Sequence, residues 1–268
     1  MNSWITYNLH SKAAPIRLFL FAHAGGGSAA FRGWNDRIGA EIELGFIQLP
    51  GHESRLSEKP FSSIAELIPG LVDALSAHID LRFAFYGQSL GARIAFETAR
   101  ELRRRGGRLP AHLFVAASQA PQLGWQHPPM NGLQTAQFLS AVQERYGSIP
   151  QQVAEDEELC NLLLPALRAD VTMVETYLYT PGLPLDCGIT AFGGLQDHTV
   201  SQLSLEQWQT QTCREFHLHM VPGNHFFPQS AESRLPESIA AELIDIVRTQ
   251  SEEDYELHLK RNVKDANP

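Results

Sequence analysis

The sequence predicts an α/β fold with a mostly parallel central sheet and helices on both faces. Short apolar runs bounded by turn residues alternate along the chain with segments of helical periodicity, which is the pattern of such a sheet. One long interval shows helical periodicity only, so we also expect a helical insertion. A chain of 268 residues with 43% hydrophobic content can bury the core of a single domain of this class.

The expected elements follow one another in β-α-β order. Strands are expected at Arg17–Ala22, Glu43–Leu49, Arg82–Tyr86, His112–Ala117, Gly188–Phe192 and Glu215–Val221. Helices are expected at Ile64–Ile79, Leu90–Arg105, Leu205–Thr210 and Glu232–Arg248. Sheets of this kind build their sites from the loops that follow the carboxyl ends of the strands.

The insertion is expected between residues 121 and 184. This interval contains no good strand, but Thr135–Tyr146 and Asp156–Tyr177 carry apolar residues at helical spacing. So long an ordered excursion is uncommon for a loop. We interpret the interval as a lid over the sheet of one domain that spans residues 1–250, with a separate domain as the alternative.

The charge distribution excludes one class of partner. A net charge of −9 argues against a surface that holds nucleic acid. The run Arg103-Arg104-Arg105 is a candidate docking patch, but it closes an expected helix before Gly106, where cations complement the helix dipole. Residues 251–268 are dense in charge with little periodicity, and we expect a flexible tail there.

The cysteines and the N-terminus bear on the compartment. Cys160, Cys187 and Cys213 are widely spaced and form no CxxC pattern, which argues against a disulfide framework or a zinc site. No signal-peptide pattern opens the chain, and no window approaches the roughly 18 to 20 apolar residues of a membrane span. We expect a cytoplasmic monomer without a metal or cofactor and without membrane contact.

The strongest chemical signal is Gly87-Gln88-Ser89-Leu90-Gly91, a GxSxG pattern. It follows one expected strand and opens one expected helix, which is the context that a sharp strand-to-helix turn requires. Such a turn needs small residues two positions from the serine, and the helix N-terminus favours negative charge near the hydroxyl. GxSxG alone is weak evidence, but in this context it indicates that Ser89 is a nucleophile.

A serine nucleophile needs a histidine base and a carboxylate that orients the base. Asp197 follows one expected strand and His225 follows the next, in the order serine, aspartate, histidine. Both positions are loops after strand ends, where sites form. We therefore interpret Ser89, Asp197 and His225 as a catalytic triad.

Other acids and histidines compete for these roles. Asp186 precedes its strand and so belongs to the opposite edge, while Asp170 lies in an expected insertion helix. His217 and His219 alternate along a strand, where a structural histidine is the usual interpretation. His198 adjoins the proposed acid and stays an alternative base.

Backbone N–H groups for the oxyanion of the reaction intermediate are expected from two segments. Leu90 supplies one by its position after the nucleophile. The other should come from the glycine-rich run His23-Ala24-Gly25-Gly26-Gly27, which follows the first expected strand of the parallel sheet. An ordinary flexible turn is the alternative, and a phosphate loop is disfavoured because no GK[ST] follows.

Six segments form a further pattern that spans nearly the whole chain: Phe21–Gly26, Leu49–Arg55, Gly87–Ala92, Leu164–Asp170, Gly193–Asp197 and Gly223–Phe227. Together, and in this order, they resemble the type II (stand-alone) thioesterases of polyketide and nonribosomal peptide synthases, which have the α/β-hydrolase fold.

The resemblance implies hydrolysis of an acyl group from the phosphopantetheine arm of an acyl or peptidyl carrier protein, often to clear stalled or mis-primed chains. By the same resemblance, Ser89, Asp197 and His225 match the family triad, and Ala24 and Leu90 match its oxyanion donors. Arg55 matches a family feature whose role the sequence does not give. Two positions depart from the family: Gln88 stands where histidine is more common, and Ala22 where proline is. Neither departure removes a catalytic group.

The insertion should supply an apolar surface for the acyl chain and gate its access. Candidate lining residues are Trp125, Phe138, Leu162, Leu163 and Tyr177, although apolar helical stripes more often serve packing. Two alternatives remain for the activity. A carboxylesterase, lipase or chain-releasing acyltransferase would use the same triad, and a non-catalytic binding protein would keep the fold and dispense with the triad.

Overall fold

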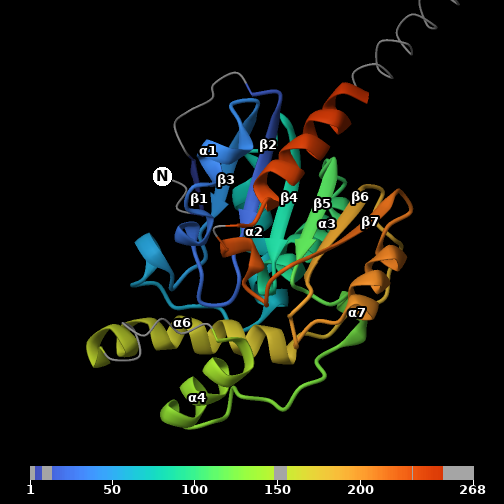
Figure 1. Cartoon of the computed structure of the whole chain (residues 1–268). Coiled ribbons are helices and arrows are strands. Elements are labelled where there is room, and N and C mark those ends of the chain that lie inside the picture. The colour runs from blue at the N-terminus through green and yellow to red at the C-terminus, as the bar shows by residue number, and fades with distance from the viewer. Residues whose placement is uncertain (1–3, 8–13, 148–155, 231, 250–268) are drawn as a thin grey trace, which may run out of the picture.

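A seven-stranded sheet forms the centre of the protein (Figure 1). The computed structural model describes residues 4–7, 14–147, 156–230 and 232–249. The strand order is β1-β3-β2-β4-β5-β6-β7, and every pair is parallel except β1 with β3. The strands are β1 Ile5–Tyr7, β2 Ile16–Phe21, β3 Ile42–Ile47, β4 Arg82–Gln88, β5 His112–Ala116, β6 Gly188–Gly194 and β7 Phe216–Val221.

All six expected strands are present, and each end lies within two residues of its predicted position. The antiparallel edge strand β1 was missed. It has only three residues, of which Ile5 alone is buried, so it carries too little apolar periodicity to stand out.

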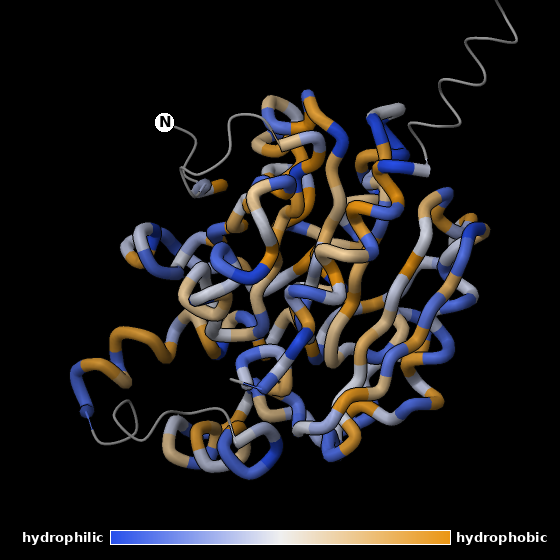
Figure 2. The backbone as a smooth tube through the Cα atoms, turned by 45° about the horizontal axis from the view of Figure 1, so that its top comes forward, coloured by the Kyte–Doolittle hydropathy of each residue, from blue (hydrophilic) through white to orange (hydrophobic). Residues whose placement is uncertain are grey.

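Helices cover both faces of the sheet. On one face, α2 (Ile64–Ser76), α3 (Leu90–Arg104) and α7 (Gln202–Glu206) contribute to one apolar cluster. On the other face, α1 (Trp34–Ile38) and a last helix over residues 235–249 contribute to a second cluster. Figure 2 shows hydrophobic residues along the central strands between these layers.

Three expected helices differ in extent from the structure. Ile64–Ile79 is shorter than predicted, because α2 ends at Ser76. Leu205–Thr210 is not one helix, because α7 ends at Glu206 and a 3₁₀ helix follows over Gln207–Gln211. The last helix begins at residue 235, three residues after the predicted start. Short 3₁₀ segments at helix ends are common and carry no distinct sequence signal.

Two long helices lie between β5 and β6, as predicted. They are α4 (Thr135–Tyr146) and α6 (Glu157–Thr176). Figure 1 shows α6 lying across the edge of the sheet where the parallel strands end, with α4 on its outer side. The helices therefore cover the edge at which a site is expected.

Two further expectations concerned a charged tail and the absence of membrane spans. The charged tail over residues 251–268 lies outside them. Within them, no helix combines the length and the apolar character that a membrane crossing requires.

Candidate active site

Ser89 occupies the sharp turn between β4 and α3. Its φ of 53° and ψ of −113° form a strained conformation for a residue with a side chain. A Cβ atom at Gly91 would lie 2.1 Å from the Phe21 carbonyl oxygen, and one at Gly87 would lie 2.4 Å from the Gly91 carbonyl oxygen. Only glycine at these two positions lets α3 pack so close to the sheet. The GxSxG pattern is thus a steric requirement of the turn that presents Ser89.

His225 connects Ser89 to Asp197. Its Nε2 atom lies 3.0 Å from Ser89 Oγ, and its Nδ1 atom lies 2.8 Å from Asp197 Oδ2. The Asp197 side chain is 1% exposed. Burial by itself raises the pKa of Asp197, but hydrogen bonds from His225 and Thr199 hold that pKa below its ordinary value. An ionised Asp197 therefore orients the imidazole with Nε2 directed at the serine hydroxyl.

The competing side chains lie elsewhere. Asp186 precedes β6 and pairs with an arginine, and Asp170 lies in α6 and pairs with a histidine. His217 and His219 lie within β7, and His198 is exposed. The structure brings together the same three side chains that the sequence singled out.

Thr199 completes the surroundings of the acid and was not singled out from the sequence. Its N–H and its hydroxyl donate to Asp197 Oδ1 at 2.8 and 2.7 Å. Its hydroxyl oxygen also lies 3.0 Å from His225 Nδ1. The available signal was a hydroxyl residue two positions after the acid, where short polar side chains bond within their own turn.

The two segments expected to supply oxyanion donors lie beside Ser89. Ala24, in the loop after β2, lines one cavity together with Ser89 and His225. Leu90, the first residue of α3, lines an adjoining cavity that the same two side chains border. The first N–H groups of a helix have no partner within it, so the Leu90 N–H is available to a ligand at this end of α3.

The two cavities are small and covered by the insertion. Each has a volume of about 30 Å³, roughly the share of one water molecule in the liquid. Trp125 and Tyr146 line both, and the Tyr146 ring lies 5.0 Å from the His225 ring. The apolar wall of the first cavity comes from α4 and α6, through Val142, Leu167, Val171 and Val174.

Of the five predicted lining residues, Trp125 alone borders these cavities. Phe138 is fully buried between α4 and α6, where it packs under Arg168. Leu162 and Leu163 are exposed on α6. Apolar spacing on a helix does not tell which stripe faces the neighbouring helix and which faces the ligand.

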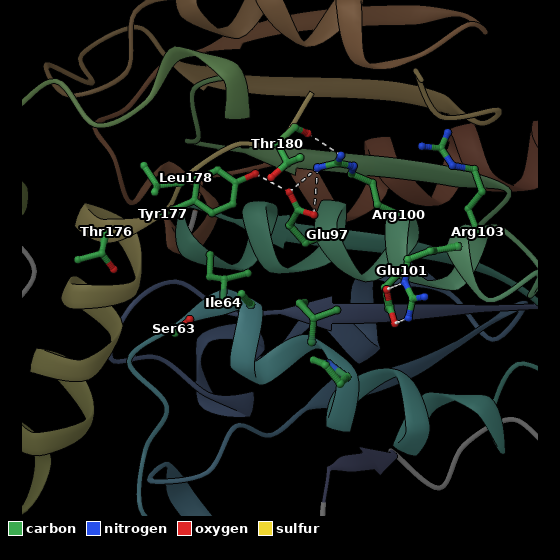
Figure 3. A pocket seen from close by; sticks show the side chains of 14 residues that line it. Ser63, Ile64, Glu97, Arg100, Glu101, Arg103, Thr176, Tyr177, Leu178 and Thr180 are labelled. Atoms are coloured by element: carbon green, nitrogen blue, oxygen red, sulfur yellow. Dashed lines mark hydrogen bonds and ion pairs between the residues drawn. The ribbon is translucent and has the colours of Figure 1, made fainter. Parts of the chain in front are cut away.

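Tyr177 lies in a different, larger groove, shown in Figure 3. This groove has a volume of about 640 Å³ and runs between α2, α3 and the segment that follows α6. Tyr177 donates a hydrogen bond to Glu97, which also pairs with Arg100 (Figure 3). The groove contains none of the three triad candidates.

The geometry has the parts required for acyl transfer through serine: a nucleophile, a base, an orienting acid and two adjacent backbone segments. Among the described residues, no group of three or more His, Cys, Asp or Glu side chains is placed to hold a metal ion. The model of the family described as "Thioesterase domain" matches residues 16–250. The chain belongs to the thioesterase family. This confirms the resemblance that the sequence motifs indicated.

Individual proteins of biosynthetic pathways are similar over most of the chain. The gramicidin S biosynthesis protein GrsT of Aneurinibacillus migulanus is 38% identical over 243 residues, which cover 91% of this chain and 94% of that protein. The solved structure of the thioesterase RedJ, from the prodiginine pathway of Streptomyces coelicolor, has a TM-score of 0.80 at 36% identity and covers 86% of this chain and 91% of that one. The type II thioesterase BorB, from the borrelidin cluster, also has a TM-score of 0.80, at 29% identity, with 91% and 97% covered.

Proposed function

We propose that this thioesterase releases acyl groups from the phosphopantetheine arm of acyl or peptidyl carrier proteins, using Ser89, His225 and Asp197. The observation that carries the proposal is the position of His225, within hydrogen-bonding distance of both the serine hydroxyl and the buried carboxylate. The carrier as the source of the substrate is supported by the similar solved structures, which include type II thioesterases of the borrelidin cluster and of an NRPS/PKS pathway.

In the first half of the reaction, Ser89 Oγ attacks the thioester carbonyl carbon while His225 Nε2 takes the hydroxyl proton. The charge that develops on the carbonyl oxygen is stabilised by the Ala24 and Leu90 N–H groups. Collapse of this intermediate breaks the carbon–sulfur bond, and His225 returns the proton to the departing thiol. Asp197 stays ionised and holds the imidazole throughout.

In the second half, water attacks the acyl-serine ester by the same route and releases the carboxylic acid. No cofactor takes part, because the phosphopantetheine belongs to the substrate. Residues of α4 and α6 close over Ser89 in this structure, so we propose that the insertion acts as a lid that moves to admit the acyl chain.

The test is hydrolysis of an acylated carrier protein by the wild-type protein and by Ser89→Ala. Loss of the nucleophile is expected to lower kcat by about 10⁴- to 10⁶-fold. A fluorophosphonate probe should label the wild-type protein at Ser89 and leave the variant unlabelled. A Ser89→Ala protein that cleaves acyl thioesters at the wild-type rate would refute the proposal.

Related measurements separate the alternative activities. A clear preference for simple esters over acylated carrier protein would favour a carboxylesterase or lipase. Acyl transfer to an added alcohol or amine, in place of water, would favour an acyltransferase. Absence of probe labelling at Ser89 would favour a non-catalytic binding protein.

A further inference from the structure

Two sequence segments of the family resemblance have no role in the proposed mechanism, and the structure brings them together. Asp170, in α6, is 1% exposed. Its Oδ2 atom accepts hydrogen bonds from the Gly25 N–H at 2.7 Å and from His52 Nε2 at 2.9 Å. A single carboxylate oxygen therefore joins the insertion, the loop after β2 and the loop after β3.

The surroundings of His52 favour its protonated form. Its two ring nitrogens face two acceptors, the Pro50 carbonyl oxygen at 3.1 Å from Nδ1 and the Asp170 carboxylate at Nε2. Both bonds form only when both nitrogens carry protons. His52 is also buried, so its charge is compensated by Asp170, and the two form a buried ion pair.

Asp170, one member of the ion pair, binds one particular peptide group. The N–H that Asp170 binds belongs to the peptide bond between Ala24 and Gly25, and the carbonyl oxygen of that same peptide lies 3.0 Å from His23 Nδ1. Contacts at both ends fix the peptide plane, and this limits the rotation of the Ala24 backbone. Gly25 has a φ of +73°, and a Cβ atom there would lie 2.9 Å from Leu167 of α6, so the loop is also packed under the same helix.

We propose that Asp170 and His52 are positioning residues that hold the Ala24 N–H in place for the oxyanion. The inference rests on the proposed function, because it assigns the Ala24 N–H to the reaction intermediate. It also links the position of α6 to catalysis, because the helix that covers Ser89 carries the Asp170 carboxylate. This carboxylate fixes the loop that contains Ala24 and Gly25, here called the donor loop. Neither side chain touches the substrate in this assignment.

The test compares Asp170→Leu, Asp170→Asn and a matched control, Glu175→Gln. Glu175 lies on the same helix and also accepts two backbone N–H groups, those of Met130 and Asn131, outside the donor loop. The measurements are kcat and KM for p-nitrophenyl acetate and an acetyl thioester, the inhibition constant of phenylboronic acid, and Tm. The boronate forms a tetrahedral adduct on a reactive serine. Its affinity therefore reports how well the oxyanion donors are placed, without requiring turnover.

Asp170→Leu is expected to lower kcat about 10- to 100-fold, somewhat less than removal of an oxyanion donor, with KM changed less than about threefold. Boronate affinity should fall by the same factor as kcat. Asp170→Asn should restore most of kcat, because its amide oxygen can still accept from Gly25. Glu175→Gln should keep the wild-type kcat even where its Tm falls.

The inference is overturned if folded Asp170→Leu keeps a kcat within about twofold of the control, or if Asp170→Asn is impaired as much as Asp170→Leu. If Asp170→Leu does not fold, His52→Gln decides. It keeps a donor towards Asp170 but loses the charge and the contact with Pro50, and it should lower kcat and boronate affinity together by about three- to tenfold. An unchanged kcat in His52→Gln would then overturn the inference. Failure of the proposed function is distinct, because Ser89→Ala would then retain hydrolysis.

Discussion

The side-chain amides of Gln88 and Gln229 hydrogen-bond to each other in both directions, at 3.0 and 2.6 Å. Gln88 directly precedes Ser89 and is completely buried, while Gln229 follows the loop that carries His225. The pair therefore ties the nucleophile turn to the base loop. It also explains how a buried glutamine is accommodated directly before Ser89.

Gln229→Met is expected to destabilise the protein, because it leaves the buried Gln88 amide without its partner. The expected loss is about 2 kcal/mol in the free energy of unfolding, measured by urea denaturation. Replacing both glutamines by methionine should recover most of this loss, since no buried amide is left unpaired. Strictly additive losses in the double variant would contradict the paired interpretation.

Gly91→Ala should damage both the fold and the site, because a Cβ atom there would lie 2.1 Å from the Phe21 carbonyl oxygen. The expected cost is about 3 kcal/mol, typical of severe overpacking, together with a loss of kcat as α3 shifts away from the sheet. Gly132→Ala is the control, since a Cβ atom there meets nothing within 4 Å. Equal Tm values for the two variants would show that α3 tolerates the displacement.

Thr199→Val removes the hydroxyl that donates to Asp197 and keeps the backbone N–H. A hydrogen bond to a charged group is worth about 1.5 kcal/mol, which corresponds to about tenfold in kcat if it is lost in the transition state. Thr199→Ser should retain most of the activity. A kcat of Thr199→Val equal to that of wild type would mean that the backbone contacts alone orient the acid.

Tyr146→Ala should enlarge the space beside His225 and favour longer acyl chains. Burial of one additional methylene is worth about 0.8 kcal/mol, or about fourfold in affinity. KM for an octanoyl thioester should therefore fall severalfold, while KM for an acetyl thioester stays nearly unchanged. Leu162→Ala is the control, because that side chain is exposed and borders neither cavity. Equal changes for both substrates would exclude a role of Tyr146 in limiting chain length.

The ion pair of His52 and Asp170 should make stability depend on pH. Burial by itself lowers the pKa of His52, but the hydrogen bond and charge of Asp170, with the charge of Glu53, raise it above the ordinary value. His23 is a titratable neighbour of His52, and burial lowers the pKa of His23. Because the pKa of His52 is higher in the folded protein, its stabilisation is complete below about pH 6.5, the value expected in the unfolded chain, and is lost as pH rises through the folded pKa.

Accordingly, the difference in unfolding free energy between wild type and His52→Gln should be largest below about pH 6.5 and should shrink as the pH rises above that value. Urea denaturation at a series of pH values measures it. A difference that grows with pH would mean that His52 is neutral in the folded protein.

Much of the fold was predictable because its signals are local. The apolar runs of β2 to β7 and the helical spacing of α4 and α6 are properties of short segments, and the structure confirms them. The edge strand β1 and the division of α7 from its 3₁₀ extension were missed, because three residues or one turn carry no periodic pattern. Of the candidate lining residues, only Trp125 borders the two cavities beside Ser89, because helical spacing identifies an apolar stripe and not what that stripe contacts.

The sequence by itself determined the turn that presents Ser89 and the chain order of Asp197 and His225, because glycine spacing and strand ends are written in consecutive residues. Only the tertiary structure showed that Thr199 contacts His225, that Gln229 pairs with Gln88, and that Asp170 binds Gly25. These contacts join residues from separate loops and helices, and they include the buried side chains of Gln88 and Asp170, whose polar atoms need a partner once folding removes their water. No local pattern encodes them, so they become visible only once the sheet has brought the segments together.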